Sequence, residues 1–261
     1  MLSRRKFLLA APAVGASVAV MPAFAQERVA LKSGGGGTTH PLTPAIRVAA
    51  KAGRTAAALL DYSATFVKKE RVDGELIESR MALKLRHNPK SVYLKFIAPS
   101  EGREVIYVEG RNGGNMLVHE TGLASLMGTI SVDPTGSLAL RESRRPVTDV
   151  GMANMAEKLV RQWVVETELP APAVKYFPSA KLAGKPCQAI EVTHSRAHRK
   201  ILAPRVRLFV DTATGLPVRV QKFAVSAGQP QVIEDYSYLD VRTNLGLGDI
   251  DFDVANPAYD F

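Results

Sequence analysis

Apolar and polar residues alternate along most of this chain, which is typical of strands with one buried and one solvated face. In residues 76–86 the apolar side chains of Ile77, Met81, Leu83 and Leu85 fall on one side, and charged residues fall on the other. Turn residues such as Asp73-Gly74 separate the alternating segments and favour hairpins. The pattern predicts strands at residues 62–71, 76–86, 92–96, 103–110, 115–120, 174–182, 187–195, 205–211, 217–225 and 231–242.

Two other segments follow the period of 3.6 residues that is typical of helices. Residues 43–60 are rich in alanine and have a partial apolar face. Residues 149–168 form the second predicted helix, and either Thr148 or Asp149 is expected to cap its start. Its apolar residues recur at steps of three and four: Met152, Met155, Leu159 and Trp163. This helix must therefore bury one face against other elements.

About ten antiparallel strands with two substantial helices are compatible with two architectures, a closed barrel and a strongly curved open sheet. The open sheet is favoured because the helix at 149–168 interrupts the strand series and needs an apolar surface to lie on. We expect an α+β fold, mostly β, in which helices cross the concave face of a half-barrel. Residues 43–261 should form this single domain. Trp163 should be buried, with a polar partner for its indole N–H.

The first 25 residues are typical of an export signal. Three basic residues precede an apolar stretch, and Ala23-Phe24-Ala25 is a small-x-small cleavage site. The run Ser3-Arg4-Arg5-Lys6-Phe7-Leu8 resembles a twin-arginine signal. We expect twin-arginine export, cleavage after Ala25, a periplasmic location, and a flexible lead-in over residues 26–42.

Composition narrows the classes of partner and site. Hydrophobic residues make up 46% and charged residues 23%, which argues against a disordered chain or a polytopic membrane protein. The single cysteine, Cys187, excludes disulfides within the chain and cysteine-rich metal sites. The chain has 34 basic and 25 acidic residues, and three of the basic ones lie in the signal, so the mature net charge is +6. We expect a monomer that does not bind nucleic acid. The mild positive charge suits either contact with an anionic membrane or envelope polymer, or a simply solvated surface.

The C-terminal third carries several recognisable pieces. They are Arg207–Asp211, Thr214–Arg219, Glu234–Val241, Asp251–Asp253 and Asn256–Pro257. These pieces resemble an uncharacterised bacterial exported family, domain-of-unknown-function family 1571. Its wider fold relatives are similar to the periplasmic lipoprotein carrier LolA and its receptor LolB. The resemblance covers roughly residues 45–261 and implies a LolA-like half-barrel with an apolar hollow. No ligand-contact residue of LolA can be matched to a position of this chain.

An open hollow would be lined by one alternating face of the strands and by the apolar face of the second helix. The candidate ligand-binding residues are Ile77, Met81, Leu83, Leu85, Val92, Leu94, Phe96, Met152, Met155, Leu159 and Trp163. Methionine suits such a wall because its flexible side chain adapts to varied apolar partners. Periodicity does not distinguish an open hollow from a filled core, so the same residues could equally form a solid core.

The apolar segment at residues 121–128 interrupts the strand series. Leu123, Leu126 and Met127 could insert into a membrane or cap a pocket. The alternative is ordinary packing beneath the second helix, since apolar side chains are usually buried.

Candidate chemistry in the sequence is weak. His194 and His198 have metal-ligand spacing, but neighbouring cations oppose metal binding and favour a solvated basic loop. His119-Glu120 with Ser125 lacks the surrounding motif of a known nucleophile. We expect no metal, no cofactor and no catalytic residue. The favoured function is a non-catalytic carrier of a lipid, a lipoprotein acyl chain or another apolar envelope molecule. The alternative is an exported hydrolase or cofactor-binding protein.

Overall fold

The computed structural model describes residues 39–196, 198–226 and 228–261. Residues 39–261 form one compact unit. The predicted signal, its cleavage site and most of the lead-in lie outside the described residues. Within the described ranges, no helix has the length and apolar character needed to cross a membrane.

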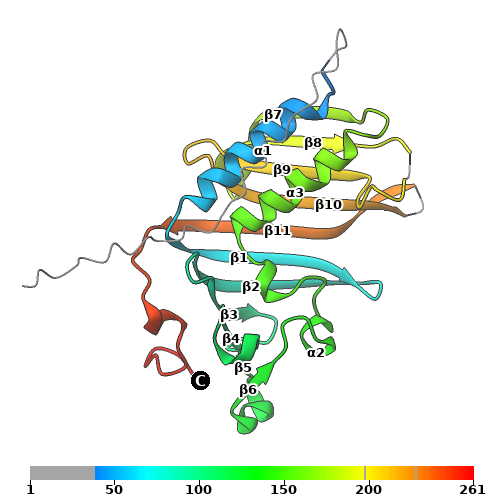
Figure 1. The fold of residues 1–261 in the computed structure, drawn as a ribbon. Helices are drawn as coiled ribbons and strands as arrows, with labels where there is room; N and C mark the ends of the chain where they lie inside the picture. Colours follow the sequence, from blue (N-terminus) through cyan, green and yellow to red (C-terminus); the bar gives the residue numbers. More distant parts are fainter. Residues whose placement is uncertain (1–38, 197, 227) are drawn as a thin grey trace, which may run out of the picture. The chain divides into compact units, whose positions relative to one another are not determined.

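The described part of the chain is built on one eleven-stranded sheet in which all neighbouring strands pair antiparallel (Figure 1). The strands are β1 (Asp61–Val72), β2 (Glu75–Arg86), β3 (Ser91–Ala98), β4 (Glu104–Val108), β5 (Met116–His119), β6 (Thr129–Val132), β7 (Ala173–Leu182), β8 (Lys185–Thr193), β9 (Arg205–Asp211), β10 (Pro217–Ser226) and β11 (Gln229–Thr243). Their order is β6-β5-β4-β3-β2-β1-β11-β10-β9-β8-β7. The first and last strands therefore meet at the centre, and β6 and β7 form the two edges.

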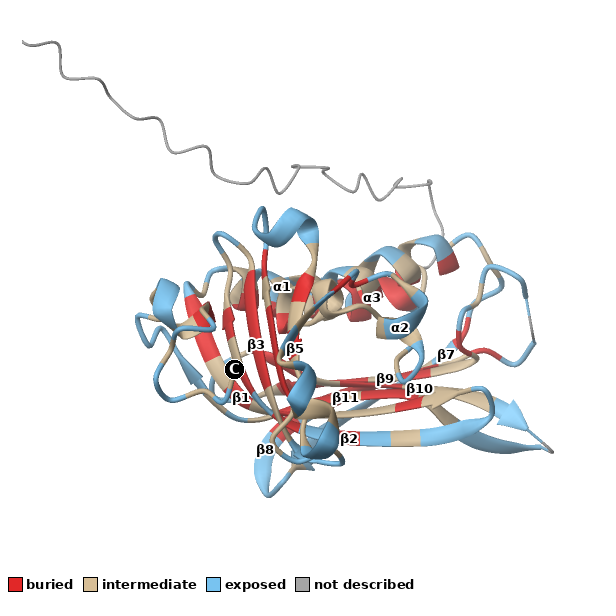
Figure 2. Cartoon of the chain, turned by 90° about the horizontal axis from the view of Figure 1, so that it is seen from below, coloured by how far each residue is buried: buried red, intermediate tan, exposed pale blue. Residues whose placement is uncertain are grey.

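Two long helices lie across one face of this sheet, over β7 to β11 (Figures 1 and 2). They are α1 (Leu42–Ala57) and α3 (Met152–Glu166), and they pack against each other and against β10. The sheet curves around them and stays open. The predicted fold class, a curved antiparallel half-barrel with helices on its concave face, is confirmed.

Local sequence accounts for the long elements. In β2, Met81, Leu83 and Leu85 are buried at alternate positions, as the period of two predicts. The predicted hairpin turn between β1 and β2 has positive φ at both Asp73 (48°) and Gly74 (91°), the backbone form that favours this pair of residues.

The segment that the sequence left unassigned holds only short elements. They are η2 (Gly122–Met127), β6, α2 (Ser137–Leu140) and η3 (Val147–Asp149). A four-residue strand or helix is too short to show a period, so pattern analysis missed β6 and α2.

The start of α3 corrects one prediction. Neither Thr148 nor Asp149 caps the helix, which begins at Met152. Two tyrosine hydroxyls from the centre of the sheet accept its first backbone N–H groups. Gly151 N–H donates to Tyr238 at 3.0 Å, and Met152 N–H donates to Tyr62 at 3.0 Å. These contacts fix the end of the helix to β1 and β11.

Two apolar clusters form the main core. One lies over β1 to β5 and includes Met152 from the start of α3. The other joins α1, α3 and β8 to β10 around Trp163, which is fully buried as predicted. The predicted polar partner of Trp163 is wrong, because its indole nitrogen has no hydrogen-bond partner among the described residues. The other buried residues of its cluster are all aliphatic, and aliphatic side chains offer no acceptor.

The C-terminal segment after β11 covers part of the opposite face of the sheet. Phe252, in the short helix η4 (Asp249–Phe252), packs with Tyr93 and Ile106. Tyr259 stacks on Tyr93 with ring centroids 4.0 Å apart. Residues 91–94 of β3 are therefore buried on both faces of the sheet, beside the cavity described next.

A cavity with an apolar wall and a cationic cluster

A cavity of about 520 Å³ lies between the concave face of the sheet, helix α3 and the chain that leads into α3. We call that chain, residues 141–151, the strap. The strap contributes Ser143, Arg145 and Val150 to the wall, and α3 contributes Met155 and Leu159. The volume falls within the usual range of about 300–1,000 Å³ for a small-molecule site.

Five of the eleven predicted lining residues border this cavity: Met81, Leu94, Phe96, Met155 and Leu159. The other six do not. Four pack in the cluster over β1 to β5, namely Leu83, Leu85, Val92 and Met152. Trp163 belongs to the second cluster, and Ile77 is half-buried. The start of α3 covers the sheet near Leu85, which explains why that part of the predicted face is filled.

Further apolar side chains, which were not predicted, complete the wall. They are Phe66, Val105, Met116, Ala139, Pro146, Val147, Val150, Val165, Leu202, Ala203, Val206, Val220, Tyr236 and Tyr238. Most of the wall is therefore hydrocarbon or aromatic, drawn from strands of both halves of the sheet.

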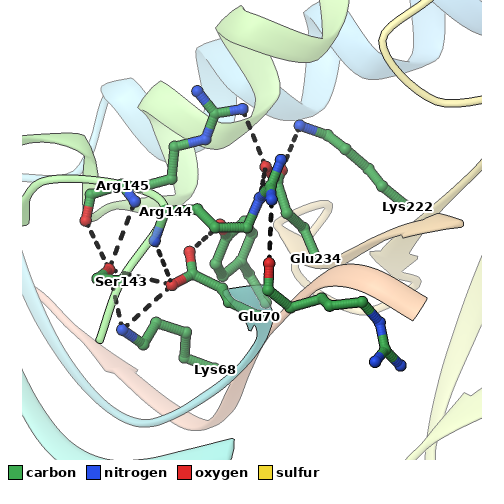
Figure 3. Close-up of polar contacts among 9 residues, drawn as sticks. Lys68, Glu70, Ser143, Arg144, Arg145, Lys222 and Glu234 are labelled. Atoms are coloured by element: carbon green, nitrogen blue, oxygen red, sulfur yellow. Dashed lines mark hydrogen bonds and ion pairs between the residues drawn. The ribbon is translucent and has the colours of Figure 1, made fainter. Parts of the chain in front are cut away.

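Four carboxylates border the cavity, those of Glu70, Asp149, Glu166 and Glu234. Glu70 on β1 and Glu234 on β11 have side chains that are 0% and 2% exposed. Among the described residues, four cations contact them: Lys68, Arg144, Arg145 and Lys222 (Figure 3). We call these six residues the cationic cluster.

Glu70 holds the strap against the sheet. Its carboxylate accepts hydrogen bonds from Ser143 Oγ at 3.0 Å and from the backbone N–H of Arg144 at 2.9 Å. The Tyr236 hydroxyl also donates to it, and Lys68 Nζ lies 3.3 Å away. A buried carboxylate with this many donors is fully satisfied.

Three cations contact the carboxylate of Glu234. Lys222 Nζ lies 2.6 Å from it, Arg145 Nη2 3.0 Å and Arg144 Nε 3.3 Å. Burial by itself would raise the pKa of Glu234, but the attraction of Lys222 and Arg145 outweighs burial and lowers that pKa below its ordinary value. Burial acts to lower the pKa of Arg145, but Glu234 outweighs it and raises that pKa. Glu234 and Arg145 are therefore both charged at neutral pH.

The sequence pattern does not reveal this cluster, for a physical reason. Lys68 and Glu70 continue the row of Phe66 along β1, so their side chains share the concave face of the sheet. Charged residues at the end of a strand normally indicate its solvated part. The available signal was that the charged residues Lys68 and Glu70 follow the apolar Phe66 on the same face of the strand.

The comparisons with known proteins place the chain in a family. The family model described as "Protein of unknown function (DUF1571)" matches residues 59–261. The chain belongs to the DUF1571 family. The match spans all eleven strands of the described sheet, helix α3 and the strap, and so the whole cavity. No curated protein matches the sequence of the chain.

Several solved structures are similar to this DUF1571 chain. A DUF1329 family protein from Desulfovibrio piger is 11% identical, with a TM-score of 0.40, over 83% of this chain and 98% of that one. A putative outer membrane lipoprotein-sorting protein domain from Vibrio parahaemolyticus is 13% identical, with a TM-score of 0.38, over 80% and 95%. The lipoprotein LppX from Mycobacterium tuberculosis is 12% identical, with a TM-score of 0.43, over 77% and 94%.

The histidine candidates in this DUF1571 chain are separated. His194, expected on a solvated loop, is buried instead, and its Nε2 lies 3.1 Å from Glu166 on α3. His198 is exposed. Across the described ranges, no group of three or more His, Cys, Asp or Glu residues is arranged to hold a metal ion.

The candidate nucleophile set of His119, Glu120 and Ser125 does not form. Glu120 pairs with Arg103 at 2.7 Å, and the Ser125 hydroxyl donates to the carbonyl of Gly122. Cys187 is a small buried residue, as its place in a predicted strand indicated.

The apolar loop between β5 and β6 is exposed. Leu123 is 89% exposed, Leu126 86% and Met127 67%. The alternative of packing beneath the second helix is therefore wrong. None of the three residues borders the cavity.

Proposed function

We propose that this DUF1571 protein is a non-catalytic periplasmic binding or carrier protein for an apolar envelope molecule, such as a lipid or a lipoprotein acyl chain. The observation that supports this most is the largely apolar cavity of about 520 Å³ on the concave face. Burying an alkyl chain there gains about 0.8 kcal/mol per CH₂ group, so affinity needs no catalytic group. The export signal at residues 1–25 supports a periplasmic location reached by the twin-arginine pathway.

Binding of N-phenyl-1-naphthylamine, an uncharged fluorescent probe, tests this proposal. The purified protein should bind the probe saturably. Phe96→Trp and Met155→Trp each enlarge a half-buried residue of the cavity wall and should weaken binding. Leu60→Trp makes a similar change at a site that is 73% exposed and outside the cavity, and it should leave binding unchanged. Equal binding by all three variants, or no saturable binding, would contradict the proposal.

We propose further that the exposed loop of Leu123, Leu126 and Met127 is where the protein touches a membrane. An apolar patch of this kind often marks an interaction site. Replacing Leu123 and Leu126 together by serine should reduce co-flotation with anionic phospholipid vesicles. The change should leave the melting temperature alone, because both side chains are already solvated. Unchanged co-flotation would argue against this contact.

A further inference from the structure

We propose that the ligand is an anionic amphiphile whose headgroup binds at Arg145 and Lys222, beside Lys68, while its chain lies on the apolar wall. This inference rests on the proposed function and narrows it to one chemical class. The three cations border the same cavity as Met81, Leu94 and Phe96. The cavity therefore places positive charge next to a hydrocarbon surface.

The charge of the cluster is unbalanced. Four cations surround two carboxylates, which leaves an excess of two positive charges among these six residues. The other charged residues of the wall have partners of their own: Lys158 contacts Asp149, Arg161 contacts Glu157, and Glu166 Oε2 lies 3.1 Å from His194 Nε2. None of these ion pairs includes a residue of the cationic cluster.

The carboxylates of the cluster are already occupied. One Glu70 oxygen accepts from Ser143 and from the Arg144 backbone, and the other accepts from Tyr236. Each oxygen of Glu234 also has a cationic partner. A cationic headgroup would find no open acceptor there and would be repelled by the excess charge.

The cations still have donors to offer. The Lys222 side chain is 19% exposed, Lys68 15% and Arg145 38%, and all three border the cavity. Lys222 uses one of its three ammonium donors and Arg145 one of its five guanidinium donors, both on Glu234. Lys68 already has three partners, the Glu142 carbonyl, Ser143 Oγ and Glu70, and adds positive charge beside the other two cations. In a partly desolvated wall, an anion placed among them is attracted more strongly than it would be in water.

Three twelve-carbon amphiphiles with different headgroups test this inference: dodecanoate, dodecanol and dodecylammonium. Each is measured by its displacement of N-phenyl-1-naphthylamine from the wild-type protein at neutral pH and low salt. Dodecanoate should bind about tenfold or more tightly than dodecanol, because charge-assisted hydrogen bonds form with the anion alone. Dodecylammonium should bind more weakly than dodecanol. Added salt should reduce the advantage of dodecanoate.

Single substitutions test whether the preference for dodecanoate arises at the cationic cluster. Lys222→Gln and Arg145→Gln should each reduce the preference for dodecanoate over dodecanol several-fold, and neither should weaken dodecanol itself. Lys185→Gln removes the same charge from an exposed pair with Asp240, outside the cavity, and should change nothing. Should a cluster variant fail to fold, the wild-type comparison of the three headgroups decides by itself.

The two proposals fail in different ways. If dodecanol and dodecanoate displace the probe equally well, the anionic headgroup is refuted and an apolar ligand is retained. If the probe does not bind saturably, the carrier function itself is refuted.

Discussion

Glu70 and Glu234 occupy positions where a strand of a half-barrel would normally carry an apolar residue. Each is buried, and each is accommodated by donors from the strap and from neighbouring strands. Burying such charges is costly unless partners compensate fully, so the cluster holds the strap in one position. The pattern of apolar residues along the strands and helices could identify Phe96 and Met155 as apolar wall residues. It could not identify the cluster, because its members approach one another only when β1, β10, β11 and the strap come together.

Glu234 gives a prediction at this scale. Its pKa lies below the ordinary value of 4.5 in the folded protein, so the stability it contributes is present above that value. That stability is lost as the pH falls through the lowered pKa. Glu234→Gln should reduce the free energy of unfolding at neutral pH by about 1–3 kcal/mol. The deficit is moderate because Arg144 and Arg145 are exposed enough to turn towards water.

Urea denaturation across a pH series measures this deficit. The difference between wild type and Glu234→Gln should shrink as the pH drops below about 4.5, since the wild-type carboxyl then becomes protonated too. Glu157→Gln, in an exposed pair with Arg161, is the control and should cost below about 1 kcal/mol. A difference that stays constant with pH would count against the account of Glu234.

At the scale of elements, helix α3 shows how tertiary contacts replace a local cap. Its apolar period of three and four predicted its existence and its buried face correctly. Its start was predicted wrongly because the acceptors come from Tyr62 and Tyr238, far away in sequence. No local pattern reports such partners. Gly151 is required here, because its φ is 131° and a Cβ atom would lie 3.1 Å from Leu85.

The tyrosines give the prediction for this element. Tyr62→Phe leaves the Met152 N–H without its acceptor in a buried setting, and Tyr238→Phe does the same to Gly151. Each change should lower the free energy of unfolding by about 1–3 kcal/mol, measured by urea denaturation followed by circular dichroism. Tyr176→Phe, at a half-exposed edge position, should have little effect. Stabilities equal to wild type in both variants would show that the hydroxyls do not hold the helix.

At the scale of the whole molecule, the pairing of β1 with β11 creates the site. It joins the two halves of the sheet and brings Glu70 beside Tyr236. Alternation predicted ten of the eleven strands of the described sheet, and the helix that interrupts the strand series favoured the open curved sheet. It did not predict which strands are neighbours, because pairing between the ends of a chain leaves no mark on local periodicity. The cavity therefore depends on a contact that only the folded chain shows.

Native mass spectrometry of the protein recovered from its cells, followed by solvent extraction of the bound material, tests the central claim most directly. We predict one molecule with an acyl chain and an acidic headgroup per protein chain. The amount bound should fall in Phe96→Trp and should be kept in Leu60→Trp. A bound metal ion or polar cofactor, with no acyl compound in the extract, would contradict the account and favour an exported hydrolase or cofactor-binding protein.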